Sequence, residues 1–560
     1  MENSRKYVLV GAVLTTVLLV IIVGWMLVSH FSYGKEWADY DELYHTDKGT
    51  AVFVDDTVTS YYALCRSDHV YLPVDTVKAL LNDRFYVSPE GILMYTLPRE
   101  TVETAPEQRM WTIGGVTTKT SWPVCFEKND VLYVAVEYAA MFTDMRYSFY
   151  EEPDRLMIYL GSGEENWTQV TKTAQVRYLA GRKALILAEV PKGEEVCVLG
   201  TMDDWTRVRT TDGFIGYMPT KVLGESYSLA LENEYIEQNY TSISQEEPVC
   251  LGWHQVFVEE ANQYLTEYLD TAQGLNVVSP TWFALSDEEG GFTSLAEQWY
   301  VDEVHERGLQ VWALINDFNT EVDKYELLSR TDSRRTLIAN LMAAAAEFDL
   351  DGINIDFELI NKETGEHFIQ FIRELSAECR KAGLVLSIDN YSLVGGRKWY
   401  YVEEQGIVAD YVIMMGYDEH WSGGTPGSTA SITFTKQTID LALEKVPAKK
   451  LIHGIPFYTR VWGAEAGVNV SSTAAGMLAA KKLLEENNAD LRWLDDEGQY
   501  FGEYLLDGIM YSIWLEDVTS LELKLEAVKE ADAAGIACWK LGLEDPEVWP
   551  LISEYLEYLK

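Results

Sequence analysis

Short stretches in which apolar and polar residues alternate recur through the second half of the chain. This period of two is typical of β-strands, and segments with the 3.6-residue period of amphipathic helices, such as residues 367–381 and 521–533, lie between them. Eight strands and their helices, spread over about 310 residues (248–560), predict one (β/α)8 TIM barrel with insertions. The predicted strands cover residues 249–256, 275–282, 309–315, 352–358, 385–390, 411–417, 451–456 and 535–540.

The fourth predicted strand has an unusual polar face. Side chains at alternate positions share a face, so Asn354, Asp356 and Glu358 point one way and the apolar residues between them point the other. Placing two carboxyl groups and an amide inside a barrel costs several kcal/mol unless they are hydrogen-bonded or functional. An edge strand with a wet face is the alternative. Because side chains at the carboxyl ends of barrel strands line the active site, Glu358 is a candidate catalytic residue.

The first half of the chain begins with an uncharged apolar run at residues 7–28. Its length matches the roughly 20 residues that span a bilayer. Arg5 and Lys6 precede it, which predicts a short cytoplasmic tail (1–6) and an extracytoplasmic remainder in a single-pass membrane protein. A cleavable signal peptide is the alternative, although the run is longer than the usual apolar region and no clear cleavage motif follows it.

The segments between this run and the barrel are predicted as two small domains with linkers. A polar linker (29–49) leads into an α+β module (50–161) in which residues 68–81 and 130–142 resemble each other. Residues 168–225 consist of short β-rich runs separated by turns, which predicts a small all-β domain, and residues 226–247 are read as a second linker.

Composition excludes several functions. The formal charge of −45 argues against nucleic acid as a partner. The six cysteines are far apart and lack the spacing of a zinc knuckle. Buried free thiols are expected for most of them, and a bridge between Cys65 and Cys125 is an open alternative. Neither a metal-binding spacing, a P-loop nor a Rossmann glycine pattern is present, so no cofactor and no metal are implied.

Residues 351–358, DGINIDFE, resemble the Asp-Gly-x-x-x-Asp-x-Glu signature of family 18 glycoside hydrolases, the chitinase-like enzymes. The resemblance implies that Glu358 protonates the glycosidic oxygen, and that Asp356 orients the substrate's 2-acetamido group, which attacks the anomeric carbon in place of an enzyme nucleophile. Many members have Asp where this chain has Asn354, although wall- and spore-lytic members also carry Asn, and the resemblance makes Asn354 a candidate substrate-binding residue. An amide cannot share a proton with Asp356, so the family's pH optimum does not transfer.

The ends of later strands extend this resemblance. Residues 414–418, MMGYD, are similar to the family's Met-x-Tyr-Asp motif, which implies that Met415 packs the sugar pocket and that Tyr417 and Asp418 hold the acetamido group. Trp539 matches the tryptophan that forms the floor of the −1 sugar site. These matches occur in the family's order and cover about 55% of the chain.

Five further residues are candidate substrate contacts. Tyr458 and Arg460 lie in the segment GIPFYTR (454–460), which resembles the family's seventh strand, and Trp282, Asn316 and Tyr391 lie at the ends of the second, third and fifth predicted strands. A purely structural role in the core is an equal alternative for each of them.

The small domains also carry resemblances. Residues 205–209 (WTRVR) and 213–218 (GFIGYM) resemble bacterial SH3 domains, which implies contact with wall peptides or glycans, although the aromatic residues are also expected in an ordinary core. The module at 50–161 resembles the small domain named after the N-terminus of copper amine oxidases, and we expect it to act as a spacer or wall contact.

Together these features predict an extracytoplasmic, membrane-anchored glycosidase that cleaves β-1,4 bonds at N-acetylglucosamine by a substrate-assisted retaining mechanism. The anchor, the SH3-like domain, Asn354 and residues 278–283 (VSPTWF) favour peptidoglycan as the polymer. Chitin or a host glycan is the alternative within the same enzyme class. A glycan-binding barrel without catalysis is a second hypothesis, and an envelope protein in which the small domains carry the function is a third.

Overall fold

The computed structural model describes residues 2–231, 235–245 and 247–559. They form two units, which are described separately: residues 1–85, 104–111 and 117–237 make the first, and residues 86–103, 112–116 and 238–560 make the second. The first unit begins with the 30-residue helix α1 (Glu2–Phe31). Its segment Leu9–His30, with a mean hydropathy of 2.5, is long and apolar enough to cross a membrane.

The N-terminal module is built on a seven-stranded sheet with the order β11-β12-β1-β2-β3-β10-β9. Short helices follow β3 and β10, namely α3 (Val74–Leu80) and α4 (Val136–Ala140). The strands are β1 (Thr50–Val54), β2 (Thr57–Arg66), β3 (His69–Pro73), β9 (Cys125–Lys128), β10 (Val131–Ala135), β11 (Met145–Tyr150) and β12 (Arg155–Leu160), with a separate hairpin of β7 (Met110–Ile113) and β8 (Val116–Lys119).

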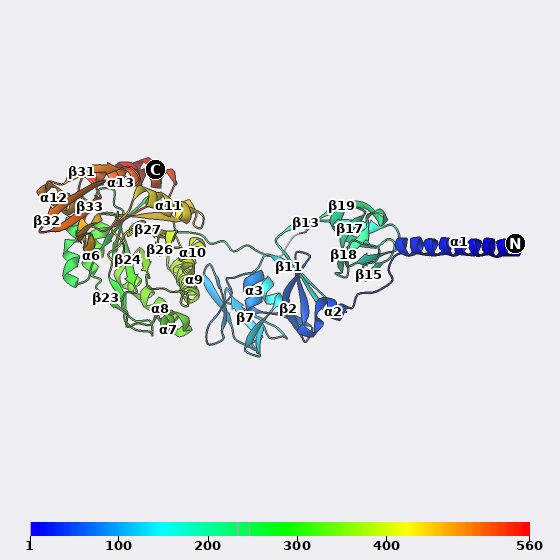
Figure 1. The fold of residues 1–560 in the computed structure, drawn as a ribbon. Helices are drawn as coiled ribbons and strands as arrows, with labels where there is room; N and C mark the ends of the chain where they lie inside the picture. The colour runs from blue at the N-terminus through cyan, green and yellow to red at the C-terminus, as the bar shows by residue number, and fades with distance from the viewer. Residues whose placement is uncertain (1, 232–234, 246, 560) are drawn as a thin grey trace. The chain divides into compact units, whose positions relative to one another are not determined.

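A second seven-stranded sheet, antiparallel throughout, forms the domain of residues 163–231, called the β domain below (Figure 1). Its order is β15-β14-β18-β17-β16-β13-β19. The strands are β13 (Gly163–Val170), β14 (Ala174–Arg177), β15 (Ile186–Val190), β16 (Glu195–Met202), β17 (Trp205–Thr210), β18 (Ile215–Pro219) and β19 (Leu223–Leu231). The sheet therefore extends five or six residues beyond each end of the predicted domain.

Residues predicted as the first linker are packed rather than extended in solvent. The amide of Ala38 donates to the carbonyl of Ile186 in β15 (2.8 Å), and the hydroxyl of Tyr40 donates to the carbonyl of Leu187 (2.5 Å). Ala38 and Tyr44, the last residue of α2 (Tyr40–Tyr44), are buried in the core of the β domain. A polar composition suggested a linker, but the few apolar residues in it are sufficient to dock it.

All six cysteines are free thiols. Cys65 is exposed and Cys125 is buried, so the alternative of a Cys65–Cys125 bridge is not realised. The other four are buried, as expected.

The second unit contains a closed barrel of eight parallel strands (Figure 1). The order is β21-β20-β34-β28-β27-β26-β25-β24, and β21 also pairs with β24, which closes the cylinder. All eight predicted strands are confirmed. They are β20 (Val249–His254), β21 (Val277–Pro280), β24 (Gln310–Asn316), β25 (Gly352–Asp356), β26 (Val385–Tyr391), β27 (Tyr411–Met415), β28 (Leu451–Pro456) and β34 (Gly535–Trp539).

Helices follow the strands and cover the barrel. They are α5 (Leu265–Thr271), α6 (Gln298–Glu306), α7 (Lys324–Ser329), α8 (Thr331–Phe348), α9 (Gly365–Ala382), α10 (Val402–Val408), α11 (Ile432–Leu443), α13 (Val518–Glu530) and α14 (Val548–Leu559). A short hairpin of β22 (Phe283–Leu285) and β23 (Phe292–Ser294) extends the sheet beside β24.

The alternation in β25 places its two faces in different layers. Ile353, Ile355 and Phe357 belong to the hydrophobic core between the strands and the outer helices, and the ring of Phe357 stacks on Phe371 of α9 with centroids 5.8 Å apart. Asn354, on the opposite face, is completely buried inside the barrel. The alternative of an edge strand with a wet face is therefore excluded, and the polar face of β25 points into the barrel.

An α+β insertion separates the seventh and eighth barrel strands. Its five-stranded antiparallel sheet has the order β30-β29-β33-β32-β31. The elements are β29 (Tyr458–Glu465), β30 (Val468–Gly476), α12 (Met477–Glu486), β31 (Asp490–Leu494), β32 (Gln499–Leu506) and β33 (Ile509–Leu515).

A small sheet from the N-terminal half of the sequence belongs to the barrel unit. It consists of β4 (Tyr86–Val87), β5 (Leu93–Leu97) and β6 (Glu100–Thr104). The hydroxyl of Tyr86 shares a hydrogen bond with His367 of α9 (2.7 Å), and Gln370 of α9 donates to Thr96 (3.1 Å). Part of the predicted 50–161 module is thus packed on the barrel.

A buried ion pair connects the insertion to the barrel. The ammonium of Lys524 in α13 lies 2.9 Å from Oε1 of Glu516, which follows β33, and neither side chain is more than 1% exposed. Gln499 of β32 donates to the other oxygen of Glu516 (2.8 Å) and accepts from Ser428 (2.5 Å). Removing one partner of such a pair leaves an uncompensated buried charge.

We therefore expect Glu516→Gln to lower the free energy of unfolding of the barrel unit by about 3–5 kcal/mol, because the Lys524 ammonium loses its counter-charge. Urea denaturation followed by tryptophan fluorescence would measure the change. Asp532→Asn is the matched control, since it removes the partner of Lys449 in an ion pair whose side chains are 70% and 71% exposed, and it should cost about 1 kcal/mol or less. Equal losses in both variants would contradict the role of the buried pair.

Candidate active site

Asn354 is the centre of a hydrogen-bond network inside the barrel. Its carbonyl oxygen accepts from the indole N–H of Trp253 (3.1 Å) and the hydroxyl of Ser279 (3.0 Å). Its amide nitrogen donates to Ser387 (3.0 Å) and to Oδ1 of Asp389 (2.8 Å). Two acceptor and two donor positions are all that an Asn side chain has, so Asn354 holds its neighbours in place and has no group left for a ligand.

Three carboxyl groups lie close together above this amide. Burial holds the pKa of Asp356 well above its usual range, and the charge of Glu358 and a hydrogen bond shared with it raise that pKa further. Burial also raises the pKa of Asp389 to about 8, although the hydrogen bond that Asn354 donates to it lowers this pKa. Three like charges cannot all be ionised in such a site, so protons are retained in this cluster near neutral pH.

Glu358 lies just beyond the strand rather than inside it. Strand β25 ends at Asp356, two residues earlier than predicted, because the backbone N–H of Glu358 donates to the carboxylate of Asp317 (2.9 Å) instead of to a neighbouring strand. The N–H of Leu359 donates to the same carboxylate (3.0 Å). Asp317 follows β24 and is completely buried, and it fixes the turn that presents Glu358 at the carboxyl end of the barrel.

The Glu358 carboxyl group has opposing neighbours. Burial raises its pKa, the hydrogen bond that the hydroxyl of Tyr391 donates to Oε2 lowers it, and the negative charge of Asp317 raises it. The guanidinium of Arg397 stacks on the ring of Tyr391 at 3.8 Å from the centroid, and its charge also lowers the pKa of Glu358. The net result is a raised pKa, which suits a proton donor.

Aromatic side chains surround these carboxyl groups. Trp253 meets Tyr417 edge to face at 6.4 Å and Trp539 at 5.8 Å, and Tyr417 meets Tyr458 at 6.3 Å between ring centroids. Met415, the last residue of β27, is buried in the same cluster. Burial holds the pKa of Tyr417 well above its usual range, so its hydroxyl is a proton donor for hydrogen bonds at any working pH.

Two local features shape the loop after β27. Gly416 passes so close to the buried His453 that a Cβ atom would lie 2.3 Å from the imidazole ring, which leaves room only for glycine. Asp418 has a positive φ of 57°, a conformation that Asp adopts more readily than most residues. In this conformation its carboxylate accepts a hydrogen bond from the hydroxyl of Tyr458 (2.6 Å).

The structure brings most of the predicted residues together but places Trp282 and Asn316 apart from the rest. The indole N–H of Trp282 donates to the buried Asn262 (2.8 Å), and the side chain, only 1% exposed, lies in the core between barrel and helices. Asn316 uses its side chain to bind the backbone of Phe283 and Phe318. Trp282 and Asn316 therefore have structural contacts here, and their role in substrate binding stays a prediction, as does that of Asn354, whose side chain is fully hydrogen-bonded.

Arg460 has an intermediate position. Its guanidinium donates to Ser472 on the neighbouring strand β30 (3.0 Å). Burial raises the pKa of Tyr458, and the positive charge of Arg460 lowers it by a smaller amount. Arg460 therefore contacts the strands β29 and β30 that carry Tyr458 and Ser472, and not the carboxyl groups near Glu358.

Sequence reasoning missed Asp317, Asp389, Trp253 and Arg397. Asp389 was within reach, because Ser387, Asp389 and Tyr391 alternate with apolar residues in the fifth predicted strand just as the polar residues of the fourth do. Arg397 lies in a loop and Asp317 acts through a contact between two strand ends, and neither leaves a periodic signal.

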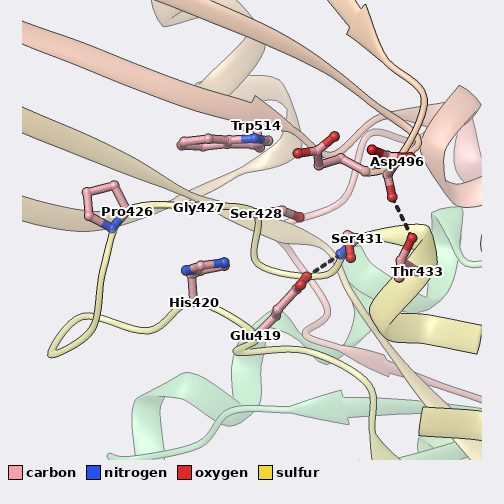
Figure 2. Close-up of a pocket in the computed structure, with 10 residues that line it drawn as sticks. Glu419, His420, Pro426, Gly427, Ser428, Ser431, Thr433, Asp496 and Trp514 are labelled. Carbon is pink, nitrogen blue, oxygen red and sulfur yellow. Dashed lines mark hydrogen bonds between the residues drawn. The ribbon is translucent and has the colours of Figure 1, made fainter. Parts of the chain in front are cut away.

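A pocket of about 460 Å³ lies between the loop after Asp418 and the insertion (Figure 2). Its wall includes the ring of Trp514 and the carboxyl groups of Glu419, Asp496 and Glu497. Glu419 accepts from the backbone of Ser431 (2.8 Å), which fixes one side of the pocket. None of the predicted site residues lines it. Within the described part of the chain, no three or more His, Cys, Asp or Glu side chains are arranged to hold a metal ion.

Comparisons with known proteins agree on the class of the barrel. The model of the glycosyl hydrolases family 18 matches residues 259–544. The cortical fragment-lytic enzyme of Bacillus subtilis is 28% identical over 252 residues, which are 43% of this chain and 58% of that relative. The glycosylase YvbX of the same organism is 26% identical over 293 residues, which are 50% of this chain and 84% of that relative.

A solved structure supports the fold. The spore cortex-lytic enzyme SleL of Bacillus cereus superposes with a TM-score of 0.51 and 22% identity, over 59% of this chain and 77% of that one. The matched segment spans little more than half the length of the Bacillus subtilis enzyme. The match of the family model over half of the chain identifies this protein as a member of glycoside hydrolase family 18, and hence as a glycosidase.

Proposed function

We propose that this protein is a membrane-anchored, extracytoplasmic hydrolase that cleaves β-1,4 bonds next to N-acetylglucosamine in a wall polymer, with peptidoglycan as the preferred substrate. The observation that carries the mechanism is the state of Asp356. Its Oδ1 atom is buried and has no hydrogen-bond partner in the described protein, and burial and the negative charge of Glu358 raise the pKa of its carboxyl group. A buried carboxyl oxygen of this kind is suited to accept the N–H of a 2-acetamido group.

In this mechanism Glu358 protonates the glycosidic oxygen while the acetamido oxygen attacks the anomeric carbon. Asp356 holds the acetamido N–H, the hydroxyl of Tyr417 donates to the acetamido oxygen, and both keep the group near the carbon that it attacks. The oxazolinium intermediate is then opened by water, with Glu358 as the base, and the anomeric configuration is retained. Trp539 and Met415 provide the apolar floor on which the sugar ring packs.

Many family members have an Asp at the position of Asn354, beside the equivalent of Asp356. In this chain Asp389, which is hydrogen-bonded to Asn354, is the carboxyl group beside Asp356. Asn354 donates to one oxygen of Asp389, and the charge of Asp389 helps to raise the pKa of Asp356. We infer that Asp389, when it is ionised, favours the protonated form of Asp356, whose proton is then available to share with Glu358. Asn354 positions Asp389 for this and does not itself bind sugar.

The preference for peptidoglycan rests on the combination of an apolar N-terminal helix with the β domain, which resembles bacterial SH3 domains, and on the cortical fragment-lytic relative. Chitin and host glycans are the alternatives in the same enzyme class. A barrel that binds glycan without cutting it is a different class of function, and the retention of Asp356, Glu358 and Tyr417 in one cluster opposes it.

The decisive test is digestion of purified peptidoglycan and of chitin oligosaccharides by the full-length protein in detergent. The product masses would identify the new reducing end, which we expect to be N-acetylglucosamine. Glu358→Gln should lower turnover by a factor of about 10²–10⁴, because the proton donor is lost. Glu363→Gln, the same change at an exposed position five residues away, is the control and should be fully active. If the wild-type protein binds either glycan and releases no product, the binding barrel replaces the enzyme.

A second test uses the pKa of Glu358. The activity of a general acid falls as pH rises through its pKa. Tyr391→Phe removes a hydrogen bond that stabilises the ionised carboxylate, so it should raise the pKa and move the alkaline limb of kcat/KM to higher pH. Asp317→Asn removes a negative charge that raises this pKa, so the limb should move to lower pH.

The profiles should be measured with an unmodified chitin tetrasaccharide and detection of new reducing ends, because an activated aryl leaving group needs little protonation. The pKa of Asp317 itself is raised to about 6 by burial, so its charge acts on Glu358 mainly above that pH. Shifts of the same sign in both variants, or no shift in either, would mean that Glu358 does not set the alkaline limb.

A further inference from the structure

The segment that leaves helix α1 is bonded to a loop of the β domain that is about 150 residues away in the sequence. The ammonium of Lys183 lies 3.0 Å from the hydroxyl of Ser32, and the amide of Gly34 donates to the carbonyl of Arg182 (2.7 Å). The buried Arg177 donates to the carbonyl of Gly34 (2.8 Å). Loop 178–185, which joins β14 to β15, is thereby held against residues 32–34.

This contact fixes where the loop lies relative to the end of the apolar span. The span ends at His30, and Ser32 is two residues further on. A residue extends the chain by at most about 3.6 Å, so the Lys183 side chain is held within roughly two residue lengths of the end of the span. The conclusion depends only on chain connectivity and on the hydrogen bonds, and is independent of the direction in which α1 leaves the domain.

The exposed side chains at this place have the composition of a membrane interface. Tyr33, Trp37, Tyr178 and Leu179 are 39%, 52%, 46% and 60% exposed. Aromatic residues of this kind are enriched where the bilayer meets water, because one end of the ring is apolar and the other is polar. A monomeric soluble surface would gain nothing from exposing these four side chains close together.

Charge distinguishes this place from the rest of the protein. Segments 32–37 and 178–185 contain three basic residues, Lys35, Arg182 and Lys183, against the single acidic residue Glu36, although the whole chain carries a charge of −45. Next to Tyr33 there is also a cavity of about 270 Å³ whose lining includes Lys172, Lys221 and one acidic residue, Glu189. We call segments 32–37 and 178–185 together with this cavity the exit face.

We propose that the exit face is a lipid-binding surface, in which the aromatic and apolar side chains enter the headgroup layer and the basic side chains pair with lipid phosphates. The cavity beside Tyr33 is lined by Lys172, in the turn between β13 and β14, and by Lys221, in the short helix after β18, and it accommodates one phosphate-bearing headgroup. The inference rests on the proposed membrane anchoring. It assigns the β domain, and not the module that comes first in the sequence, to the membrane surface, and it makes the lipid bilayer rather than a wall glycan the partner of this face.

The test places an environment-sensitive fluorophore at single cysteines in the full-length protein, reconstituted in nanodiscs. Cys65, the exposed native thiol, is first replaced by Ser. Leu179→Cys reports the exit face, and Leu229→Cys, an exposed leucine (46%) in β19, is the matched control. A third label at Val17→Cys, within the apolar span, reports anchoring independently.

We expect a quencher attached to lipid headgroups to quench the 179 label at least about threefold more than the 229 label, and acrylamide to do the opposite. Nanodiscs of phosphatidylcholine with phosphatidylglycerol should show a larger difference than phosphatidylcholine alone. Reversing two charges in Arg182→Glu with Lys183→Glu should abolish the difference. Reversing two exposed charges elsewhere in the same unit, Lys119→Glu with Lys128→Glu, should leave it intact.

The outcomes separate the two proposals. If the 17 label lies in lipid while acrylamide quenches the 179 and 229 labels equally, the chain is anchored and the exit face faces water, which overturns the inference alone. If the 17 label is also in water, membrane anchoring fails and the lipid-binding surface fails with it. Glycosidase activity in the same samples is independent of both results.

Discussion

The active-site end of the barrel depends on carboxyl groups that are held in an interior too apolar to ionise them all. Asp356 and Asp389 lie inside a closed ring of strands and Glu358 lies just beyond its end, where an uncompensated charge costs several kcal/mol. Among the residues that the structure describes, no cation contributes to the pKa of Asp356 or of Asp389. The network places the neutral Asn354 at the centre and leaves protons on the carboxyl groups themselves. Retained protons are what a general acid requires, so the constraint and the chemistry coincide.

The same constraint explains the packing around β25. Ile353, Ile355 and Phe357 form the apolar outer face of the strand, and Phe357 packs on α9. Because side chains alternate between the two faces, those of Asn354 and Asp356 point into the barrel. A shift of one residue would bury the isoleucines inside the barrel and turn three polar groups onto the helices. The hydrophobic contacts with α9 therefore select the register that presents Asp356 and Glu358 to the site, although none of those contacts touches substrate.

Periodicity was sufficient to predict the eight strands, and the carboxyl end of each strand indicated where functional residues gather. Asp356 and Glu358 became candidates in this way, whereas Tyr417 and Trp539 became candidates through the resemblance to family 18. What periodicity does not contain is the direction of a side chain once the strand has ended. Strand β21 stops at Pro280 and the chain turns, so Trp282 points outward to Asn262 although it lies two residues from the strand. Asp317 escaped prediction because its partners are backbone N–H groups of Glu358 and Leu359, which follow another strand.

The linear order of predicted domains also differs from the way in which the chain is packed, and this changes what a deletion can show. Arg334 of α8 is completely buried and is stabilised by Glu374 (3.0 Å) and by the hydroxyl of Tyr86 (3.3 Å), which comes from the small sheet of β4, β5 and β6. Residues 86–103 therefore complete the barrel unit rather than an independent module.

Removing residues 50–225 would seem a simple way to separate the enzyme from its small domains. It would also remove Tyr86 and expose a buried arginine and its partners on α9, and a loss of the kind expected for a broken buried network would follow. Loss of activity in such a truncation would reflect this damage as much as any role of the N-terminal domains. A truncation that retains residues 86–103 is the one that isolates the barrel, because the contacts of Arg334 with Glu374 and Tyr86 then remain within one unit.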